Sequence, residues 1–191
     1  MKHVNGYLEL LRLRSNETYE HSLRVAELSL KLGRINGLES SDVDTLYKAG
    51  LLHDIGKIEV PDGILAKNGS LSEEERMVIN EHVRKGSYIL QNEGLEEVKK
   101  VMLMHHEFSP NPYPRNGERR DGHRNNGSDR RRQVDFRTYS LAQMLAVSDT
   151  CDALVSPRAY KPALSKDEVK AGLEKGFKGE RKYIDQVLSL V

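Results

Sequence analysis

Apolar residues recur every three or four positions along most of this chain of 191 residues. That spacing places them on one face of an α-helix, whereas a half-buried strand would alternate apolar and polar residues. No long segment alternates in that way. The periodic segments predict helices at 3–13, 17–34, 42–54, 73–91, 95–106, 138–154, 166–175 and 181–190. We therefore expect an all-α fold, and the length suits a single domain over residues 1–191.

Local signals mark where two of these helices begin. Ser72 with Glu75 and Ser165 with Glu168 each predict a capping box, in which the two side chains satisfy backbone amides at the start of a helix. Residues 60–72 contain Asp-Gly and Asn-Gly pairs, which are typical of turns. We expect a loop there.

Residues 109–137 break the helical pattern with three prolines, several glycines and an excess of arginine. We expect a long, exposed basic loop inside the domain, since helical periodicity resumes after it. The plain interpretation is a solvated loop. The alternative is a collar of positive charge that attracts an anionic nucleotide or an acidic partner protein.

Composition narrows the class of protein. Lys and Arg (30) balance Asp and Glu (29), so the net charge does not favour binding of a nucleic-acid polymer. No apolar run approaches the ~20 residues of a membrane span. The single cysteine, Cys151, excludes an internal disulfide and suits a reducing compartment. We expect a cytoplasmic protein, whose apolar C-terminal residues 183–191 dock on the bundle or on a partner protein.

Histidines and carboxylates continue the apolar stripes of five predicted helices. On the helix at 17–34, for example, Glu17 and His21 stand in line with Val25 and Leu28. The full set comprises Glu17, His21, His53, Asp54, His82, His105, His106 and Asp149.

A single histidine on an apolar stripe is more often a hydrogen-bonded core residue than a ligand. A helical domain of this size has only one core, however, so the five faces should converge. Five histidines and three carboxylates buried together without a cation would cost many kcal/mol of desolvation. A metal cluster removes that cost. Imidazole and carboxylate without thiolate suit iron, manganese or zinc.

Five motifs stand in order between about residues 16 and 162: ETYEHSLRV, LLHDIGKIEVPDGILAKNGSLSEEE, INEHVRKGSYIL, HHE and LAVSDTCDALVSPRAYK. This ordered set resembles the HD superfamily of metal-dependent phosphohydrolases, specifically its HD-GYP branch. The resemblance implies a single-domain, all-α helical bundle around a central cluster of two or three metal ions. We expect these to be divalent transition metal ions, preferably iron or manganese. The resemblance also implies hydrolysis of the cyclic dinucleotide c-di-GMP to pGpG, GMP or both.

The resemblance also implies roles for individual residues. All eight histidines and carboxylates named above match metal ligands, with Asp54 as the carboxylate that bridges metals and Glu17 as the ligand of a third ion. Lys57 matches the lysine beside the reacting phosphate. Arg158 and Lys161 match basic residues that hold the phosphates of the substrate.

The expected chemistry also follows from the residues themselves. Two metals about 3.5–4 Å apart can hold a bridging hydroxide as the nucleophile that attacks a phosphodiester. Lys57 can offset the charge that develops on the phosphoryl oxygens. We therefore expect Asp54 and Lys57 to carry the catalysis.

The chain departs from the branch at the motif that names it. Pro112-Tyr113-Pro114 stands where the branch has glycine-tyrosine-proline, and proline cannot copy the backbone freedom of glycine. Tyr113 can stack on a substrate base.

Three functions therefore stay open. The first is hydrolysis of c-di-GMP. The second is hydrolysis of another cyclic dinucleotide or of a phosphorylated nucleotide. The third is a regulatory module that binds nucleotide or a partner without useful turnover. The complete ligand set counts against the third function, and the altered loop favours the second and third.

Overall fold

A computed structural model describes residues 2–67, 69–91, 94–110, 135–156 and 164–191 of the chain. Within these ranges the regular elements are helices, and no strand occurs. In chain order they are α1 (Lys2–Arg14), α2 (Asn16–Ile35), α3 (Ser40–Leu52), the 3₁₀-helix η1 (Ile55–Glu59), α4 (Asp62–Leu65), α5 (Glu73–Asn80), α6 (His82–Ile89), α7 (Glu96–Leu103), α8 (Phe136–Val155), α9 (Lys166–Gly176) and α10 (Arg181–Leu188). The predicted all-α class is confirmed.

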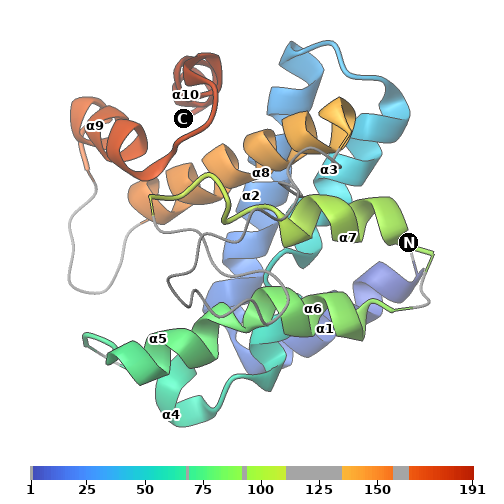
Figure 1. Cartoon of the computed structure of the whole chain (residues 1–191), viewed down its shortest axis with the longest axis vertical. Helices are drawn as coiled ribbons and strands as arrows, with labels where there is room; N and C mark the ends of the chain where they lie inside the picture. The colour runs from blue at the N-terminus through green and yellow to red at the C-terminus, as the bar shows by residue number, and fades with distance from the viewer. Residues whose placement is uncertain (1, 68, 92–93, 111–134, 157–163) are drawn as a thin grey trace, which may run out of the picture.

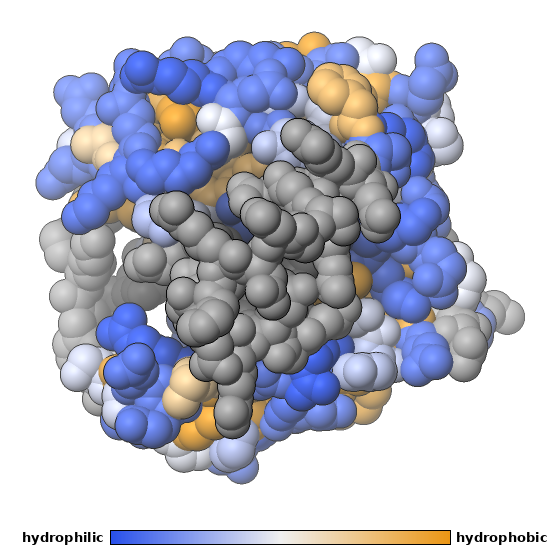
Figure 2. Space-filling model, viewed as in Figure 1, coloured by the Kyte–Doolittle hydropathy of each residue, from blue (hydrophilic) through white to orange (hydrophobic). Residues whose placement is uncertain are grey.

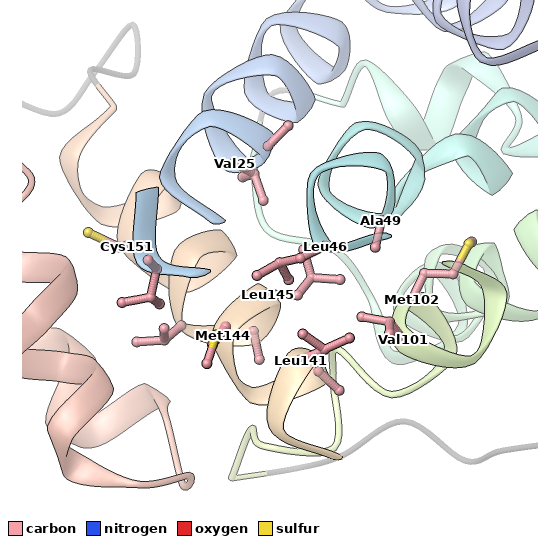
Figure 3. Close-up of a cluster of buried hydrophobic side chains, with 14 of the residues drawn as sticks. Val25, Leu46, Ala49, Val101, Met102, Leu141, Met144, Leu145 and Cys151 are labelled. Atoms are coloured by element: carbon pink, nitrogen blue, oxygen red, sulfur yellow. The ribbon is translucent and has the colours of Figure 1, made fainter. Parts of the chain in front are cut away.

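Helix α8 runs through the middle of the bundle, with α2 and α3 packed against it (Figure 1). Residues 141–148 of α8 are buried around the whole helix, which explains why this segment is apolar on all sides. Val25 of α2, Leu46 of α3 and Leu145 of α8 belong to one hydrophobic core (Figure 3). This core holds α2, α3 and α8 together. Helices α2 and α8 carry predicted ligands, and two more predicted ligands directly follow α3.

The last two described helices, α9 and α10, pack along α8, with α9 against its C-terminal part and α10 against its N-terminal part (Figure 1). Helices α4 and α5 lie at the opposite end of the molecule. Tyr183 and Val187 of α10 are buried, and the hydroxyls of Tyr183 and Ser140 lie 2.9 Å apart. The C-terminal segment therefore docks on the bundle, as expected. Both predicted capping boxes are present, at the starts of α5 and α9.

Three predicted helices end or divide earlier than expected. The predicted helix at 73–91 divides at Glu81 into α5 and α6. The one at 42–54 ends at Leu52, and the one at 95–106 ends at Leu103. Adjacent residues on a helix point about 100° apart, so two neighbours cannot both face one point from inside a helix. The pairs after α3 and α7 can do so because they lie in turns.

Two glycines allow backbones near the site to approach closely. A Cβ built on Gly56 would lie 1.9 Å from the carbonyl oxygen of His82, so only glycine lets η1 sit against α6. A Cβ on Gly50 would lie 2.6 Å from Cα of Ala26, so glycine also sets the contact of α3 with α2. These contacts fix η1 against α6 and α3 against α2.

Hydrophilic side chains dominate the coloured part of the face in Figure 2, with small separate apolar spots. In the part of the chain that the structure describes, no helix combines the length and the apolar character needed to cross a membrane.

Candidate metal centre

The structure brings seven of the eight predicted ligands together inside the bundle. They come from α2, α8, the first residue of α6 and the turns after α3 and α7. Three groups have ligand atoms that all lie within 4.8 Å of one another: His21 with His53 and Asp54, His53 with His105 and Asp149, and His82 with His105 and His106.

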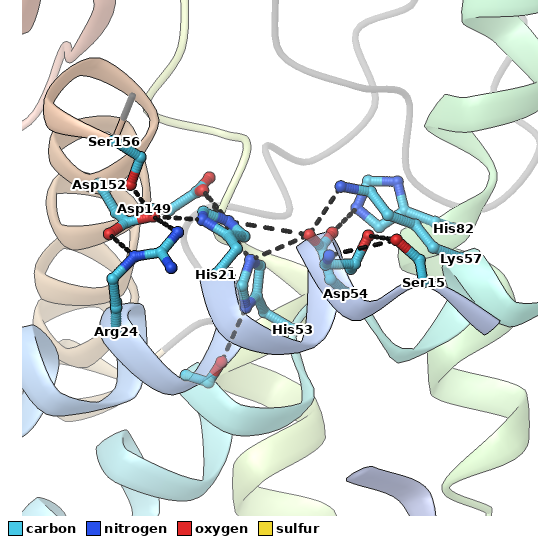
Figure 4. A network of polar contacts seen from close by, with 12 residues as sticks. Ser15, His21, Arg24, His53, Asp54, Lys57, His82, Asp149, Asp152 and Ser156 are labelled. Atoms are coloured by element: carbon cyan, nitrogen blue, oxygen red, sulfur yellow. Dashed lines mark hydrogen bonds and ion pairs between the residues drawn. The ribbon is translucent and has the colours of Figure 1, made fainter. Parts of the chain in front are cut away.

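Asp54 lies between His21 and His53 on one side and His82 on the other, and it presents its two oxygens to different histidines (Figure 4). Its Oδ2 is 3.4 Å from Nε2 of His53 and 3.8 Å from Nε2 of His21. Its Oδ1 is 3.3 Å from Nε2 of His82. A carboxylate whose two oxygens face different histidines can bridge two cations.

Asp149 supplies a second carboxylate from α8. Its Oδ1 lies 3.0 Å from Nε2 of His21 and 3.8 Å from Nε2 of His53. The side chains of His53 and Asp54 are 1% and 3% exposed, whereas those of His21 and Asp149 are 17% and 18% exposed. The cluster is therefore closed on one side and open at the edge formed by His21 and Asp149.

Main-chain hydrogen bonds set the tautomer of three histidines. Nδ1 of His53, His82 and His105 lies 2.8, 2.7 and 2.5 Å from the carbonyl oxygen three residues earlier in the chain. A carbonyl only accepts, so Nδ1 must donate and Nε2 of the neutral ring carries the lone pair. Nε2 of His53 and of His105 is buried, and neither has a hydrogen-bond partner among the described residues.

Such buried lone pairs cost free energy unless something binds them. A metal ion satisfies them, because neutral imidazole nitrogen is a common ligand of zinc, iron and manganese. The donor set of the cluster, imidazole and carboxylate without thiolate, therefore fits a centre of divalent metal ions.

The protonation states of the residues in the cluster also suit metal binding. Burial lowers the pKa of His82 to about 3 and that of His106 to about 4. It also holds the pKa of His105 well below its usual value. Burial alone would raise the pKa of Asp54, but the nearby Lys57 and histidines lower it well below the usual range. Neutral imidazoles and an ionised carboxylate are the forms that bind metals.

His21 differs from the other histidines. Burial acts to lower its pKa, but hydrogen bonds with Asp149 and Asp152 outweigh burial and raise the pKa to about 10. In this arrangement a proton on His21 balances the two carboxylates. A metal ion bound at this open edge would replace that proton in balancing the negative charge of the two carboxylates.

Lys57 completes the described part of the site. It is carried by η1, and its Nζ lies 2.6 Å from Oδ2 of Asp54. A cleft of about 710 Å³ opens over this edge and is lined by His21, Lys57 and Asp149, among others. That volume lies in the range of small-molecule sites.

The remaining predicted site residues are placed differently. Glu17 is exposed on the first turn of α2 and lines the cleft, but it belongs to none of the three ligand groups. Tyr113, Arg158 and Lys161 lie outside the described residues, as does most of the predicted basic loop at 109–137. Their roles stay predictions.

The structure adds one acidic residue that sequence reasoning missed. Asp152 is buried on α8, and its Oδ2 lies 2.7 Å from Nδ1 of His21. Arg24 and Ser156 also contact its carboxylate. The available signal was a second aspartate one turn after Asp149 on an apolar helix.

Residues 18–154 match the family described as HD domain, and the chain belongs to this family. The match covers every described residue of the cluster. The resemblance found in the sequence motifs is therefore confirmed at the level of the family.

Related proteins in bacteria agree with this assignment. The chain is 32% identical to a "Cyclic di-GMP phosphodiesterase" of Vibrio cholerae over 87% of its length, and 36% identical to one of Pseudomonas aeruginosa over 84%. It is also 32% identical to "3'3'-cGAMP-specific phosphodiesterase 2" of Vibrio cholerae over 97% of its length. The chain covers 34%, 36% and 34% of these relatives, so it spans about a third of their length.

Solved structures share the fold. The HD domain of the L. monocytogenes phosphodiesterase PgpH matches with a TM-score of 0.63 over 96% of this chain and 93% of that one, at 14% identity. The same domain in complex with Cyclic-di-AMP matches with a TM-score of 0.64 at 16% identity. At this identity the likeness shows a common HD fold.

Proposed function

We propose that this chain is a metal-dependent phosphodiesterase that hydrolyses a cyclic dinucleotide, with c-di-GMP as the substrate and pGpG, GMP or both as the product. The observation that carries the proposal is the position of Asp54. One of its oxygens faces His21 and His53, and the other faces His82. Such a carboxylate suits a site that holds two metals for phosphoryl chemistry.

The metals are proposed to be two or three ions of iron or manganese. The residues proposed to hold them are His21, His53, Asp54, His82, His105, His106 and Asp149, with Glu17 for a third ion. When bound, such ions activate water for attack on phosphorus and neutralise charge on the phosphate.

Lys57 is proposed to stabilise the charge that builds up on the phosphoryl oxygens. Its ammonium group lies beside Asp54 and its side chain is 24% exposed at the cleft, so it can meet both the buried centre and a ligand. A positive charge fixed before the reaction needs no reorganisation when the transition state forms. Arg158 and Lys161 are proposed to hold the phosphates of the substrate, and Tyr113 to stack on a base.

A second candidate substrate is 3'3'-cGAMP. The observation that favours it is the similarity to a phosphodiesterase named for that nucleotide, which extends over 97% of this chain. The two candidates share the phosphodiester bond and differ in one base. They would therefore use the same metal centre and differ in residues that contact the bases.

The experiment is a hydrolysis screen with the protein purified anaerobically and loaded with iron or manganese. c-di-GMP, 3'3'-cGAMP, c-di-AMP and linear phosphorylated nucleotides are each incubated with it, and the products are separated chromatographically. We expect c-di-GMP to be hydrolysed fastest and a chelator to stop the reaction. Faster hydrolysis of 3'3'-cGAMP would select the second candidate.

Two variants control the screen. Asp54→Ala should abolish hydrolysis. Asp44→Ala should leave it unchanged, because Asp44 is an exposed carboxylate on α3 that pairs with Lys48. Binding of nucleotide without turnover by the metal-loaded wild type would contradict the proposal and favour a regulatory module.

A further inference from the structure

Asp152 stands behind His21, on the side away from Asp54 (Figure 4). It is 2% exposed and lies on α8 one turn after Asp149. Nδ1 of His21 donates to Oδ2 of Asp152 at 2.7 Å, while Nε2 of the same ring faces Oδ1 of Asp149 at 3.0 Å. The two ends of one imidazole are therefore held by two carboxylates of the same helix.

Arg24 holds Asp152 in place from the neighbouring helix. It lies three residues after His21 on α2, and its Nε and Nη2 donate to Oδ1 and Oδ2 of Asp152 at 2.7 and 3.0 Å. Ser156 adds a hydrogen bond from its Oγ to Oδ2 at 3.1 Å. Both oxygens of the buried carboxylate are thus satisfied, and the two-point contact with the guanidinium fixes their orientation.

This arrangement is specific to His21 among the histidines whose Nδ1 contact is described. His53, His82 and His105 donate to main-chain carbonyls. Those carbonyls are fixed by the helical turn and are neutral. A carboxylate acceptor raises the basicity of the imidazole more than a carbonyl acceptor does. It also fixes the tautomer and the orientation of the ring.

We propose that Asp152 is a positioning residue for the open edge of the cluster, which fixes His21 as a metal ligand, and that Arg24 acts through Asp152. The inference rests on the metal centre proposed above. It implies that metal held at the edge of His21 and Asp149 depends on Asp152 and Arg24, although neither is among the proposed metal ligands.

The test measures metal affinity rather than turnover. Wild-type protein and the variants Asp152→Asn and Arg24→Gln are loaded anaerobically, and metal is titrated away with a competing chelator. We expect Asp152→Asn to weaken the most easily removed ion about 10–100-fold, the usual effect of losing the carboxylate behind a metal-binding histidine. The asparagine amide can donate to Nδ1. The ring proton would then lie on Nε2, and this nitrogen would have no lone pair available for a metal ion.

Arg24→Gln leaves Asp152 in place and should have a smaller effect in the same direction. Arg24→Lys should fall between wild type and Arg24→Gln, because an ammonium keeps the charge but cannot make the two-point contact. Arg24 is half-exposed, so these variants report on the inference even if Asp152→Asn does not fold.

Arg137→Gln is the matched control. Arg137 is a similarly exposed arginine that joins the start of α8 to Asp42 and Glu97, and it makes no described contact with the cluster. It should leave the metal affinity unchanged. Protection of the buried Cys151 thiol from labelling shows that each variant has kept its core.

Wild-type affinity in Asp152→Asn, or in Arg24→Gln if the first variant does not fold, would overturn the inference. So would an equal loss in Arg137→Gln, since the effect would then follow from losing any arginine that joins helices. Wild-type protein that binds no metal would overturn the metal centre itself, and the inference with it.

Discussion

At the scale of single residues, Asp54 and Lys57 form a charged pair within a buried cluster. The side chain of Asp54 is 3% exposed, and an isolated carboxylate so deeply buried would be protonated. Lys57 at 2.6 Å and the surrounding histidines keep it ionised by lowering its pKa. The ionised carboxylate of Asp54 therefore suits bound cations, and the ammonium group of Lys57 suits an anionic substrate.

Lys57→Ala should lower kcat about 10²–10³-fold and change KM less, because the lost charge would act mainly on the transition state. Steady-state kinetics at saturating metal measure both constants. Lys85→Ala is the control, since Lys85 is a partly buried lysine whose described partners are the backbone and side chain of Glu59. A kcat for Lys57→Ala close to that of wild type would contradict the assigned role.

Glu17→Gln tests the proposed third ion. Glu17 lies one helical turn before His21 and lines the cleft, so a carboxylate there can reach an ion at the open edge. We expect the variant to lose about one equivalent of metal while its circular dichroism stays unchanged. Unchanged metal content would leave Glu17 as a first-turn residue favoured by the helix dipole.

At the scale of elements, turns rather than helices present most of the cluster. The apolar periodicity predicted the helices well, because the buried face of a helix carries apolar residues at every third or fourth position of its sequence. It did not predict that α3 stops at Leu52 or α7 at Leu103. Two residues after α3, η1 packs closely on α6 at Gly56, a contact between segments far apart in sequence that local periodicity does not show.

The same reasoning explains what the sequence revealed about the site. His53 and Asp54 were found as ligand candidates because they follow an apolar run, and so were His105 and His106. Asp152 was missed because its partner His21 is 131 residues away in sequence, and no local pattern shows that pairing.

Gly56→Ala should destabilise the protein by about 1–3 kcal/mol, the usual cost of forcing extra volume into a packed contact. The added Cβ would overlap the carbonyl of His82, so η1 and α6 would separate and metal affinity would fall as well. Urea unfolding and metal titration check the two effects. Gly63→Ala in α4 is the control, because among the described residues no heavy atom outside its chain neighbours and its own helix backbone lies within 4 Å of its Cβ position. Equal midpoints for both variants would contradict the close approach.

At the scale of the whole molecule, one bundle surrounds both an apolar core and a polar centre. The core of α2, α3 and α8 continues directly into the histidine cluster, so the stability of the protein without metal should depend on the protonation of that cluster.

Stability of the metal-free protein should be greatest near pH 6.5, the ordinary pKa of histidine. Folding lowers the pKa of His82 to about 3 and that of His106 to about 4, so below pH 6.5 the unfolded chain binds protons that the folded chain excludes. The free energy of unfolding should therefore fall on acidification, by up to about 1.4 kcal/mol per pH unit for each proton.

His21 acts in the opposite direction. Its folded pKa is raised to about 10, so its stabilising contribution is complete below pH 6.5 and is lost as the pH rises toward 10. Urea unfolding of chelator-treated protein between about pH 4 and 10 measures both limbs. A free energy of unfolding that is constant across this range would contradict these pKa shifts.

The central claim is that the buried histidines and aspartates form a centre of several metal ions. Elemental analysis of protein purified without oxygen tests it most directly, because it counts ions without assuming a substrate. We predict about two or three equivalents of iron or manganese per chain, in keeping with a bridging carboxylate. Less than about one equivalent of any transition metal, in a protein with its Cys151 thiol still protected, would contradict the claim.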